Sequence, residues 1–198
     1  MPIHIALVHH PTVDKSGQTA ATSVTNLDVH DISRAGRTYG VDGFWIVHPH
    51  EGMHRYVSKM MDHWRHGWGA AYNPTRKESL HVTELAKDLG QVDTRLEALY
   101  PSQQRVWVAT SAQVVGNTLP YATMREWLFD PADDRVFVLV FGTGWGLHPA
   151  VFLEMDYVLE PIYGPTDWNH LSVRAAVAII LDRLLGVDRG TALAPPCK

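Results

Sequence analysis

The chain has 198 residues, of which 45% are hydrophobic and 19% charged, with a formal net charge of −4 and a pI of about 6.3. This balance is typical of a globular domain and excludes a large basic face for nucleic acid, although a local basic patch is compatible with it. The single cysteine, Cys197, excludes an internal disulfide framework and a thiolate metal site. No apolar run approaches the roughly 20 residues of a membrane span, and residues 1–11 lack the pattern of a signal peptide, so we expect a cytoplasmic protein without membrane contact.

Apolar segments of strand character alternate along the chain with segments of helical period. The predicted strands are residues 3–9, 43–49, 105–110, 136–141 and 157–162, and the predicted helices are residues 28–39, 51–67, 76–89, 93–100, 120–129 and 172–186. Residues 10–25 are predicted to form a polar connector. The alternation favours an α/β fold with a mostly parallel sheet flanked by helices. We expect one domain over residues 1–188 and a C-terminal tail over residues 189–198.

The predicted helix at residues 28–39 has two distinct sides on a helical wheel. Its apolar and small residues fall on one side, namely Val29, Ile32, Ala35, Gly36 and Tyr39. His30, Arg34 and Arg37 fall together on the other side. The period therefore predicts that these three basic side chains share one face.

The segment FGTGWGL at residues 141–147 follows a strand that is apolar at every position. Such a strand is typical of a parallel sheet buried on both faces, and glycines at its exit indicate a sharp turn or the close approach of another group. In open α/β sheets, ligands bind beyond the carboxyl ends of the strands. The loops at residues 109–116 and 160–169 leave strands in the same way, so the three loops are expected to meet at one ligand.

The glycine spacing alone leaves several interpretations open. A Rossmann dinucleotide site has the pattern G-x-G-x-x-G with an acidic residue about 20 positions later, whereas this loop has G-x-G-x-G and Glu160 at the end of the next strand. Residues 147–198 supply about one more strand and one long helix, too few for a Rossmann unit. A Walker loop is excluded because no G-K-[ST] follows, and a simple tight turn is a further alternative.

Three segments of the chain resemble the SPOUT, or α/β-knot, RNA methyltransferases, and are most similar to a bacterial family of predicted RNA methyltransferases of this class. They are TNLDVHDISRAGRTYGVDGFWIVHP (25–49), FGTGWGL (141–147) and LEPIYGPTDWNHLSVRAAVAIILDRLLG (159–186). The resemblance extends over nearly the whole chain. It implies a C-terminal trefoil knot, S-adenosylmethionine (SAM) as the methyl donor, tRNA or rRNA as the substrate, and a homodimer whose subunits share the active site.

The resemblance also implies that the knotted loops bind SAM, largely through backbone groups. The residues that match these loops are Thr110, Ser111, Phe141, Gly142, Thr143, Gly144, Trp145, Gly146, Ile162, Tyr163, Gly164, Asn169, Leu171 and Ser172. Asn169 is a candidate for holding the methionine end of SAM. Ser172 has a second possible role as the N-cap of the last helix.

The first motif of the 2′-O-methylating branch of this superfamily ends in an arginine. Counting back from YGV at residues 39–41 places Arg34 on that arginine, while the preceding asparagine of the motif falls on Asp28. A guanidinium can hold an RNA phosphate in a bidentate manner or stabilise an emerging alkoxide. The predicted catalytic set is therefore Arg34, His30 and Asp28, and the alternative for Arg34 is a solvated helix residue.

Two further groups of residues have a possible binding role. His48, His50 and His54 are close in sequence, but no H-E-x-x-H motif or cysteine pair is present, so we predict no metal site. Residues 63–77 interleave tryptophan and tyrosine with arginine and lysine, a combination that stacks on bases and pairs with phosphates. Core packing of the tryptophans is the interpretation that we prefer for this segment.

The sequence thus predicts a SAM-dependent RNA methyltransferase. A non-catalytic RNA-binding or assembly module that retains the knot is the alternative, and the acidic balance and Asp28 favour it. A nucleotide-dependent oxidoreductase is a third possibility that the number of strands disfavours. Binding of SAM, compared with binding of NAD, distinguishes the first from the third.

Overall fold

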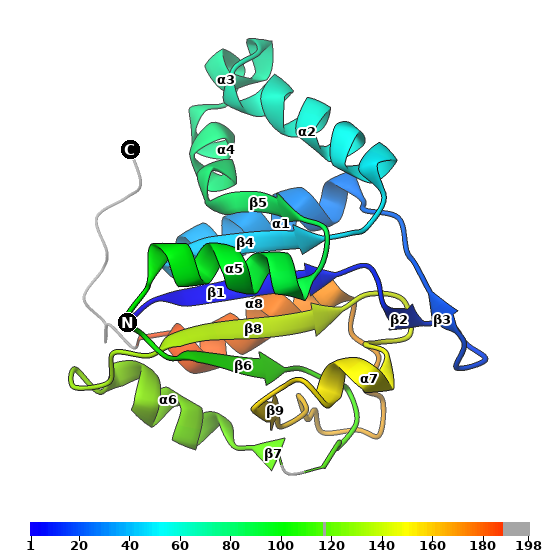
Figure 1. Cartoon of the computed structure of the whole chain (residues 1–198), viewed down its shortest axis with the longest axis vertical. Coiled ribbons are helices and arrows are strands. Elements are labelled where there is room, and N and C mark those ends of the chain that lie inside the picture. Colours follow the sequence, from blue (N-terminus) through cyan, green and yellow to red (C-terminus); the bar gives the residue numbers. More distant parts are fainter. Residues whose placement is uncertain (117, 188–198) are drawn as a thin grey trace.

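The computed structural model describes residues 1–116 and 118–187, and its centre is a seven-stranded sheet in which every pairing is parallel (Figure 1). In sequence order the strands are β1 (Ile3–Val8), β4 (Gly43–Val47), β5 (Thr83–Ala86), β6 (Arg105–Ala109), β7 (Thr118–Leu119), β8 (Val136–Gly142) and β9 (Tyr157–Leu159). Their order across the sheet is β5-β4-β1-β8-β6-β9-β7. A two-stranded antiparallel hairpin, β2 (Thr12–Val13) and β3 (Thr19–Ala20), lies outside the sheet.

Helices cover both faces of the sheet. They are α1 (Asn26–Thr38), α2 (Glu51–Arg65), α3 (Trp68–Tyr72), α4 (Pro74–Ser79), α5 (Leu89–Leu99), α6 (Tyr121–Phe129), α7 (Pro149–Phe152) and α8 (Val173–Leu185), with a short 3-10 helix at Leu80–Val82. Helices α5 and α7 lie in front of the sheet in Figure 1, whereas α1 and α8 lie behind it. The predicted α/β class and mostly parallel sheet are therefore confirmed.

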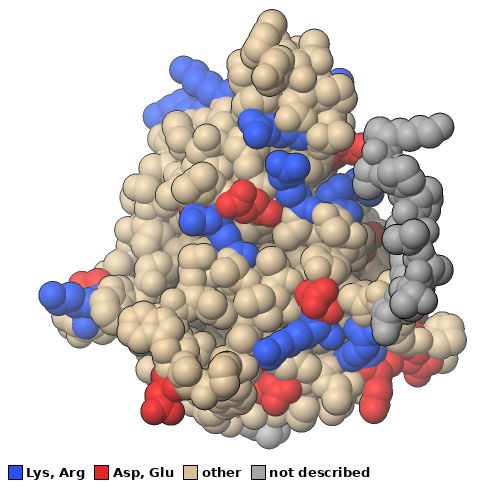
Figure 2. All heavy atoms as spheres, turned by 180° about the vertical axis from the view of Figure 1, so that it is seen from behind, with Lys and Arg blue, Asp and Glu red and all other residues tan. Residues whose placement is uncertain are grey.

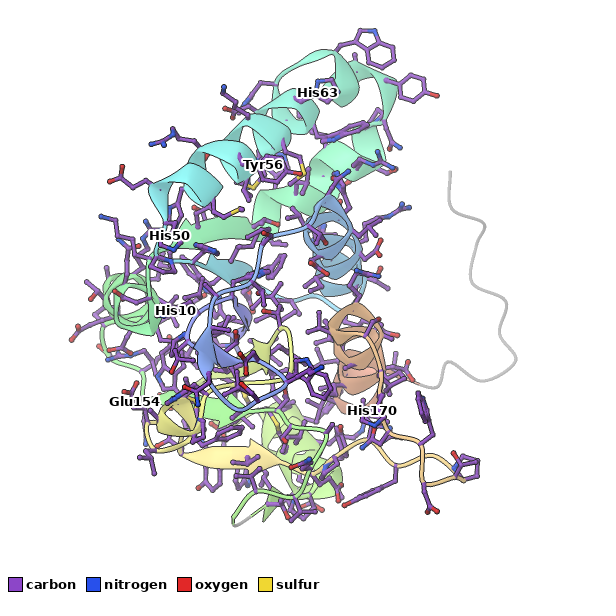
Figure 3. All side chains as sticks on the ribbon, turned by 90° about the vertical axis from the view of Figure 1, so that its right-hand side faces the viewer. His10, His50, Tyr56, His63, Glu154 and His170 are labelled. Carbon is purple, nitrogen blue, oxygen red and sulfur yellow. The ribbon has the colours of Figure 1, made fainter. Side chains whose placement is uncertain are left out.

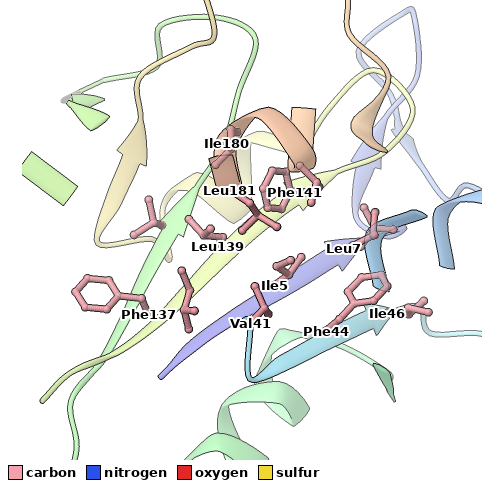
Figure 4. Close-up of a cluster of buried hydrophobic side chains, with 14 of the residues drawn as sticks. Ile5, Leu7, Val41, Phe44, Ile46, Phe137, Leu139, Phe141, Ile180 and Leu181 are labelled. Carbon is pink, nitrogen blue, oxygen red and sulfur yellow. The ribbon is translucent and has the colours of Figure 1, made fainter. Parts of the chain in front are cut away.

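The strands are apolar on both sides because each side of the sheet packs against helices. Ile5 and Leu7 of β1 point to the α1 and α8 face, where Figure 4 shows them beside residues of β4, β8 and α8. Ala6 and Val8 point to the opposite face, where they pack in a second cluster with Val92 of α5. All six residues of β1 are buried, which places this strand at the middle of the core.

The structure differs from the predicted elements in several places. The helix predicted at residues 76–89 is wrong, because α4 ends at Ser79 and residues 83–86 form strand β5 beside β4. A strand of four residues at a sheet edge is too short to leave a clear period-2 pattern. The last strand ends at Leu159 rather than at 162, the connector at residues 10–25 contains the β2–β3 hairpin, and α3 and β7 were not predicted. Residues 189–198, the predicted tail, lie outside the described residues.

The free edge of β5 carries arginine side chains. The carbonyl of Ala86 accepts the amide of His48 on the β4 side, so the carbonyls of Thr83 and Leu85 point away from the sheet. Arg65 donates to the carbonyl of Thr83, and Arg95 donates to that of Leu85 at 2.8 Å. Two guanidinium groups thus satisfy carbonyls that an additional strand would otherwise bind.

Helices α1 and α8 are joined by a charged cluster. Asp28 is 6% exposed, and one of its carboxylate oxygens lies 3.1 Å from Nη1 of Arg174. The same arginine reaches Asp31 with Nε at 3.3 Å. The other oxygen of Asp28 accepts the hydroxyl of Thr25, the N-cap residue of α1. The carboxylate therefore fixes the start of α1 against the start of α8.

Replacing Arg174 tests this structural role. Arg174→Met keeps the aliphatic length of the side chain but leaves the Asp28 carboxylate buried without its partner, so we expect the free energy of unfolding to fall by about 1–3 kcal/mol. Denaturation with urea measures it. Arg55→Met, which removes an exposed pair with Glu51, is the control and should cost about 0.5 kcal/mol or less. Equal losses in the two variants would contradict this role.

Candidate active site

The carboxyl ends of the parallel strands meet at one edge of the sheet, and four loops converge there. They follow β1, β8, β6 and β9, and they span residues 9–25, 143–148, 110–116 and 160–172. Three of them are the loops that the sequence predicted to meet. The fourth, after β1, was predicted only as a connector.

The glycine loop after β8 is docked onto the loop after β1. The hydroxyl of Thr143 donates to the carbonyl of Val8 at 3.0 Å and lies 2.5 Å from the hydroxyl of Thr22. Further along, Val13 donates its amide to the carbonyl of Gly146 at 3.0 Å and accepts the amide of Trp145 at 3.2 Å. The hairpin β2–β3 thus holds the loop in place, and the supporting residues lie 121–135 positions earlier in the chain.

Neighbouring protein atoms and the backbone conformation disfavour a side chain at two glycines of this loop, Gly142 and Gly144. A Cβ added to Gly142 would lie 2.5 Å from the amide nitrogen of Leu147, because the loop folds back over the end of β8. Gly144 has a φ of +63°, in the left-handed region that favours glycine, and a Cβ there would lie 3.1 Å from Cγ2 of Thr22. The sequence predicted that some group comes close to the backbone at these two glycines. In the structure that group is the protein itself, namely Leu147 beside Gly142 and Thr22 beside Gly144.

The other two loops are fixed to the sheet and to each other. The hydroxyl of Thr110 donates to the carbonyl of Val140 on β8 at 3.0 Å. The side-chain amide of Asn169 donates to the carbonyl of Ala112 at 2.8 Å, which joins the loop after β9 to the loop after β6. Ser172 is the N-cap of α8 and accepts the amide of Ala175, so its capping role is confirmed.

The predicted SAM-binding residues divide into buried and exposed groups. The side chain of Phe141 is 1% exposed and lies in the core, so only its backbone can face a ligand. Ile162 packs against the same core. The side chains of Trp145, Tyr163 and Leu171 are exposed, whereas the hydroxyl of Ser111 accepts the amide of Gln113. Thr143 is buried, and Gly146 and Gly164 have open space where a Cβ would stand.

The three predicted catalytic residues lie in different environments along α1. Asp28 is engaged by Arg174, as described above. His30 is buried, with its ring edge-on to Trp64 at 5.6 Å between centroids, whereas Arg34, one helical turn later, is exposed. Burial lowers the pKa of His30, and the positive charge of Arg76 lowers it further. Both ring nitrogens lack a hydrogen-bond partner among the described residues.

Arg34 is exposed, and no side-chain partner for its guanidinium lies within the described part of the chain. The neighbouring Arg37, by contrast, pairs with Glu78 at 2.6 Å. Helix α1 begins near the loop edge and runs toward the opposite edge, and six residues separate Asp28 from Arg34, a rise of about 9 Å. The fold therefore does not bring Arg34 to the glycine loop of its own chain.

The sequence missed the residues of the loop after β1 that support the site. His9 is fully buried, and its Nδ1 lies 3.0 Å from the hydroxyl of Thr22. Burial lowers the pKa of His9 to about 4, so the ring is neutral at pH 7. The pKa of the adjacent His48 is also lowered, chiefly by burial. No local signal marks Thr22, because its partner is Thr143, at the far end of the chain.

Several histidines lie near the loop edge. Figure 3 shows His10 and His50 there, close to the start of α2, and His170 beside α8. Within residues 1–116 and 118–187, however, no group of three or more histidine, cysteine, aspartate or glutamate side chains is arranged so that it could hold a metal ion. In the same residues, no helix has the length and apolar character needed to cross a bilayer.

Comparisons with known proteins agree with this architecture. An uncharacterised protein of Aquifex aeolicus is 40% identical over 187 residues, which cover 94% of this chain and 90% of that protein. A tRNA (guanine-N(1)-)-methyltransferase of Nitratidesulfovibrio vulgaris is 43% identical over 186 residues, and the match spans 93% of this chain but only 42% of that protein. The structure of the SpoU methyltransferase AviRb of Streptomyces viridochromogenes, solved in complex with AdoMet, matches with a TM-score of 0.51 at 17% identity. The matched region spans 93% of this chain and 56% of AviRb.

The likeness to AviRb concerns the fold, because the identity is low. The family match rests on the sequence itself: residues 2–186 match the family described as SAM-dependent RNA methyltransferase. This match covers all the elements of the sheet and all four loops of the candidate site. The likeness to AviRb shows a SpoU-like fold, and the family match shows that the chain belongs to the SAM-dependent RNA methyltransferases.

Proposed function

We propose that the loops at residues 110–112, 141–147 and 162–172 bind SAM and that the protein methylates a nucleotide of tRNA or rRNA. The observation that carries this proposal is that these loops meet at the carboxyl edge of the sheet and that each is held there by hydrogen bonds to a neighbouring loop or strand. The relative from Nitratidesulfovibrio vulgaris supports tRNA as the first substrate to test. This chain spans less than half of that relative, so its guanine-N1 specificity is not transferred.

The residues present fit a SAM site. Gly146 and Gly164 leave open space where side chains would stand, and the exposed side chains of Trp145 and Leu171 offer apolar surface. The hydroxyls of Thr110 and Thr143 are already used by backbone carbonyls. We therefore assign recognition of SAM mainly to backbone groups of the three loops. SAM supplies the activated methyl group, and the protein positions the nucleotide that accepts it.

We assign to Arg34 the binding of an RNA phosphate or the stabilisation of the oxygen or nitrogen that is methylated. Its guanidinium is exposed and has no carboxylate partner among the residues that the structure describes, unlike those of Arg37 and Arg174. Arginine suits this role because its planar group donates two parallel hydrogen bonds. Asp28 is a positioning residue in this scheme, since its carboxylate holds α1 against α8.

We further propose that the protein is a homodimer in which Arg34 of one subunit serves the SAM loops of the other. Arg34 lies about two helical turns from the loop edge of its own chain. Leu27 lies at the start of α1, Trp168 and Leu171 shortly precede α8, and all three side chains are exposed. Exposed apolar side chains favour a protein interface at this end of the helix pair.

Substitution of Gly144 tests the SAM site. Gly144→Val combines an unfavourable φ with a clash against Thr22, so we expect SAM binding to be lost while the helical content is retained. Isothermal calorimetry measures the binding, and circular dichroism measures the fold. Gly40→Val is the matched control, since Gly40 has a φ of +74° but has no atom near its Cβ position and lies at the far end of α1. Full SAM binding by the Gly144 variant would contradict the assignment of this loop.

Substitution of Arg34 tests the catalytic assignment. We expect Arg34→Ala to lower kcat/KM for methylation of unmodified tRNA or rRNA by about 100-fold or more, because one charge-assisted contact to the reacting nucleotide is lost. Affinity for SAM should not change. Transfer of a labelled methyl group measures the rate, and Arg55→Ala, on the outer side of α2, is the control. Wild-type rates in the Arg34 variant would remove it from the active site.

Mixing the two defective variants tests the shared site. Arg34→Ala and Gly144→Val are each expected to be inactive as homodimers. In a heterodimer one of the two sites receives both intact elements, so an equimolar mixture should regain about a quarter of wild-type activity for a symmetric dimer. The measurement is methyl transfer after co-refolding or subunit exchange. A mixture as inactive as its components would show that each site is built from one chain.

A further inference from the structure

Residues 51–82 form a helical projection at one side of the molecule, comprising α2, α3, α4 and the 3-10 helix. It leaves the sheet after β4 and returns at β5, and it stands at the top of Figure 1. Figure 3 shows α2 rising from His50, at the loop edge, to His63 near the tip. With 15 residues, α2 is about 22 Å long. The projection thus begins beside the candidate active site and ends well away from it.

The inner part of the projection is packed around Trp64. The guanidinium of Arg76 lies 4.2 Å from the centre of the Trp64 ring, and the ring of His30 contacts it edge-on from α1. A Cβ added to Gly69 would lie 2.6 Å from Cε3 of Trp64, so α3 rests directly on this ring. For Trp64, the core-packing interpretation is therefore confirmed. These contacts hold the tip of the projection in a defined position.

The outer part carries two aromatic side chains that the core does not use. Trp68 and Tyr72 are each 69% exposed, and their rings stack with centroids 4.8 Å apart and an interplanar angle of 18°. They are four residues apart on α3, so they lie on the same side of the helix. Core packing is therefore the wrong interpretation for Trp68. A stacked pair of rings in solvent offers a flat surface on which a further ring can stack.

The projection is also the basic part of an acidic protein. Residues 51–82 contain five lysine or arginine residues and three aspartate or glutamate residues, in a chain of net charge −4. Lys59 on α2 is exposed, and Lys77 on α4 is partly exposed. Figure 2 shows lysine and arginine groups gathered over the upper half of the molecule, while acidic groups dominate its lower rim. The charge therefore favours a polyanion at this end.

We propose that the tip of the projection is a second RNA contact, at which an unpaired base stacks on Trp68 and Tyr72 while Lys59 and Lys77 neutralise the adjacent phosphates. This inference rests on the proposed function, since it takes the occupant to be the RNA substrate. Unpaired bases bind proteins by stacking on aromatic rings, and basic side chains hold the backbone between them. A contact beyond the far end of α2, a helix about 22 Å long, would select RNA that presents an unpaired nucleotide well away from the methylated one.

The test measures RNA affinity with the full chain. Fluorescence anisotropy with labelled, unmodified tRNA gives Kd for the wild type, for the double variant Trp68→Ala/Tyr72→Ala and for Trp68→Phe. We expect the double variant to bind about tenfold or more weakly, because the stacking of one base is lost. Trp68→Phe retains a ring and should stay within about threefold of the wild type. Phe129→Ala is the matched control, since Phe129 is 52% exposed on α6, which follows β7 at the opposite end of the sheet from β5.

Two parallel measurements separate the possible failures. Calorimetry with SAM should give the same affinity for all variants, which shows that the active site is intact. Sedimentation without RNA should show the same oligomeric state. Wild-type RNA affinity in the double variant, or a change of oligomeric state in place of weaker RNA binding, would overturn this inference alone. A wild-type chain that binds SAM but no RNA would overturn the proposed function together with it.

Discussion

The parallel pairing of β1 with β8 is the constraint on which the rest of the structure depends. It places the first strand of the chain beside one that begins 133 residues later, and it buries both in the middle of the sheet. Because Val8 is paired with Gly142, the two loops that follow begin side by side. The hydroxyl of Thr143 then donates a hydrogen bond to the carbonyl of Val8. The geometry of the glycine loop is thus a direct consequence of the central strand pair.

A rigid loop edge is suited to holding a flexible molecule in one conformation. Each loop is fixed by hydrogen bonds to a neighbouring loop or strand, so little ordering entropy is left to be lost when a ligand binds. Backbone groups in such loops keep their positions without help from long side chains. The arrangement also explains why the predicted SAM-binding residues include many that contribute no side-chain chemistry, such as Phe141, whose ring belongs to the core.

The fold class and the main strands could be predicted because buried parallel strands are uniformly apolar and amphipathic helices separate them. The loop cluster was also predictable, since the carboxyl ends of parallel strands share one edge. Strand β5 was not, because a four-residue edge strand leaves too short a pattern. The roles of Asp28 and His30 were also missed: their partners Arg174 and Trp64 lie on other helices, and a helical wheel contains no information about them. Catalytic roles and the trefoil knot stay predictions from resemblance.

The guanidinium groups of Arg65 and Arg95 at the edge of β5 restrict how copies of the chain can associate. An open edge of a parallel sheet is a template for another strand, and extension across it leads to continuous sheets and aggregation. Here the outward carbonyls of Thr83 and Leu85 already have donors. A second strand would have to displace two charged groups before it gained any hydrogen bond. The edge chemistry therefore disfavours pairing of this sheet with the sheet of another copy, a cost that contact through helical faces would not carry.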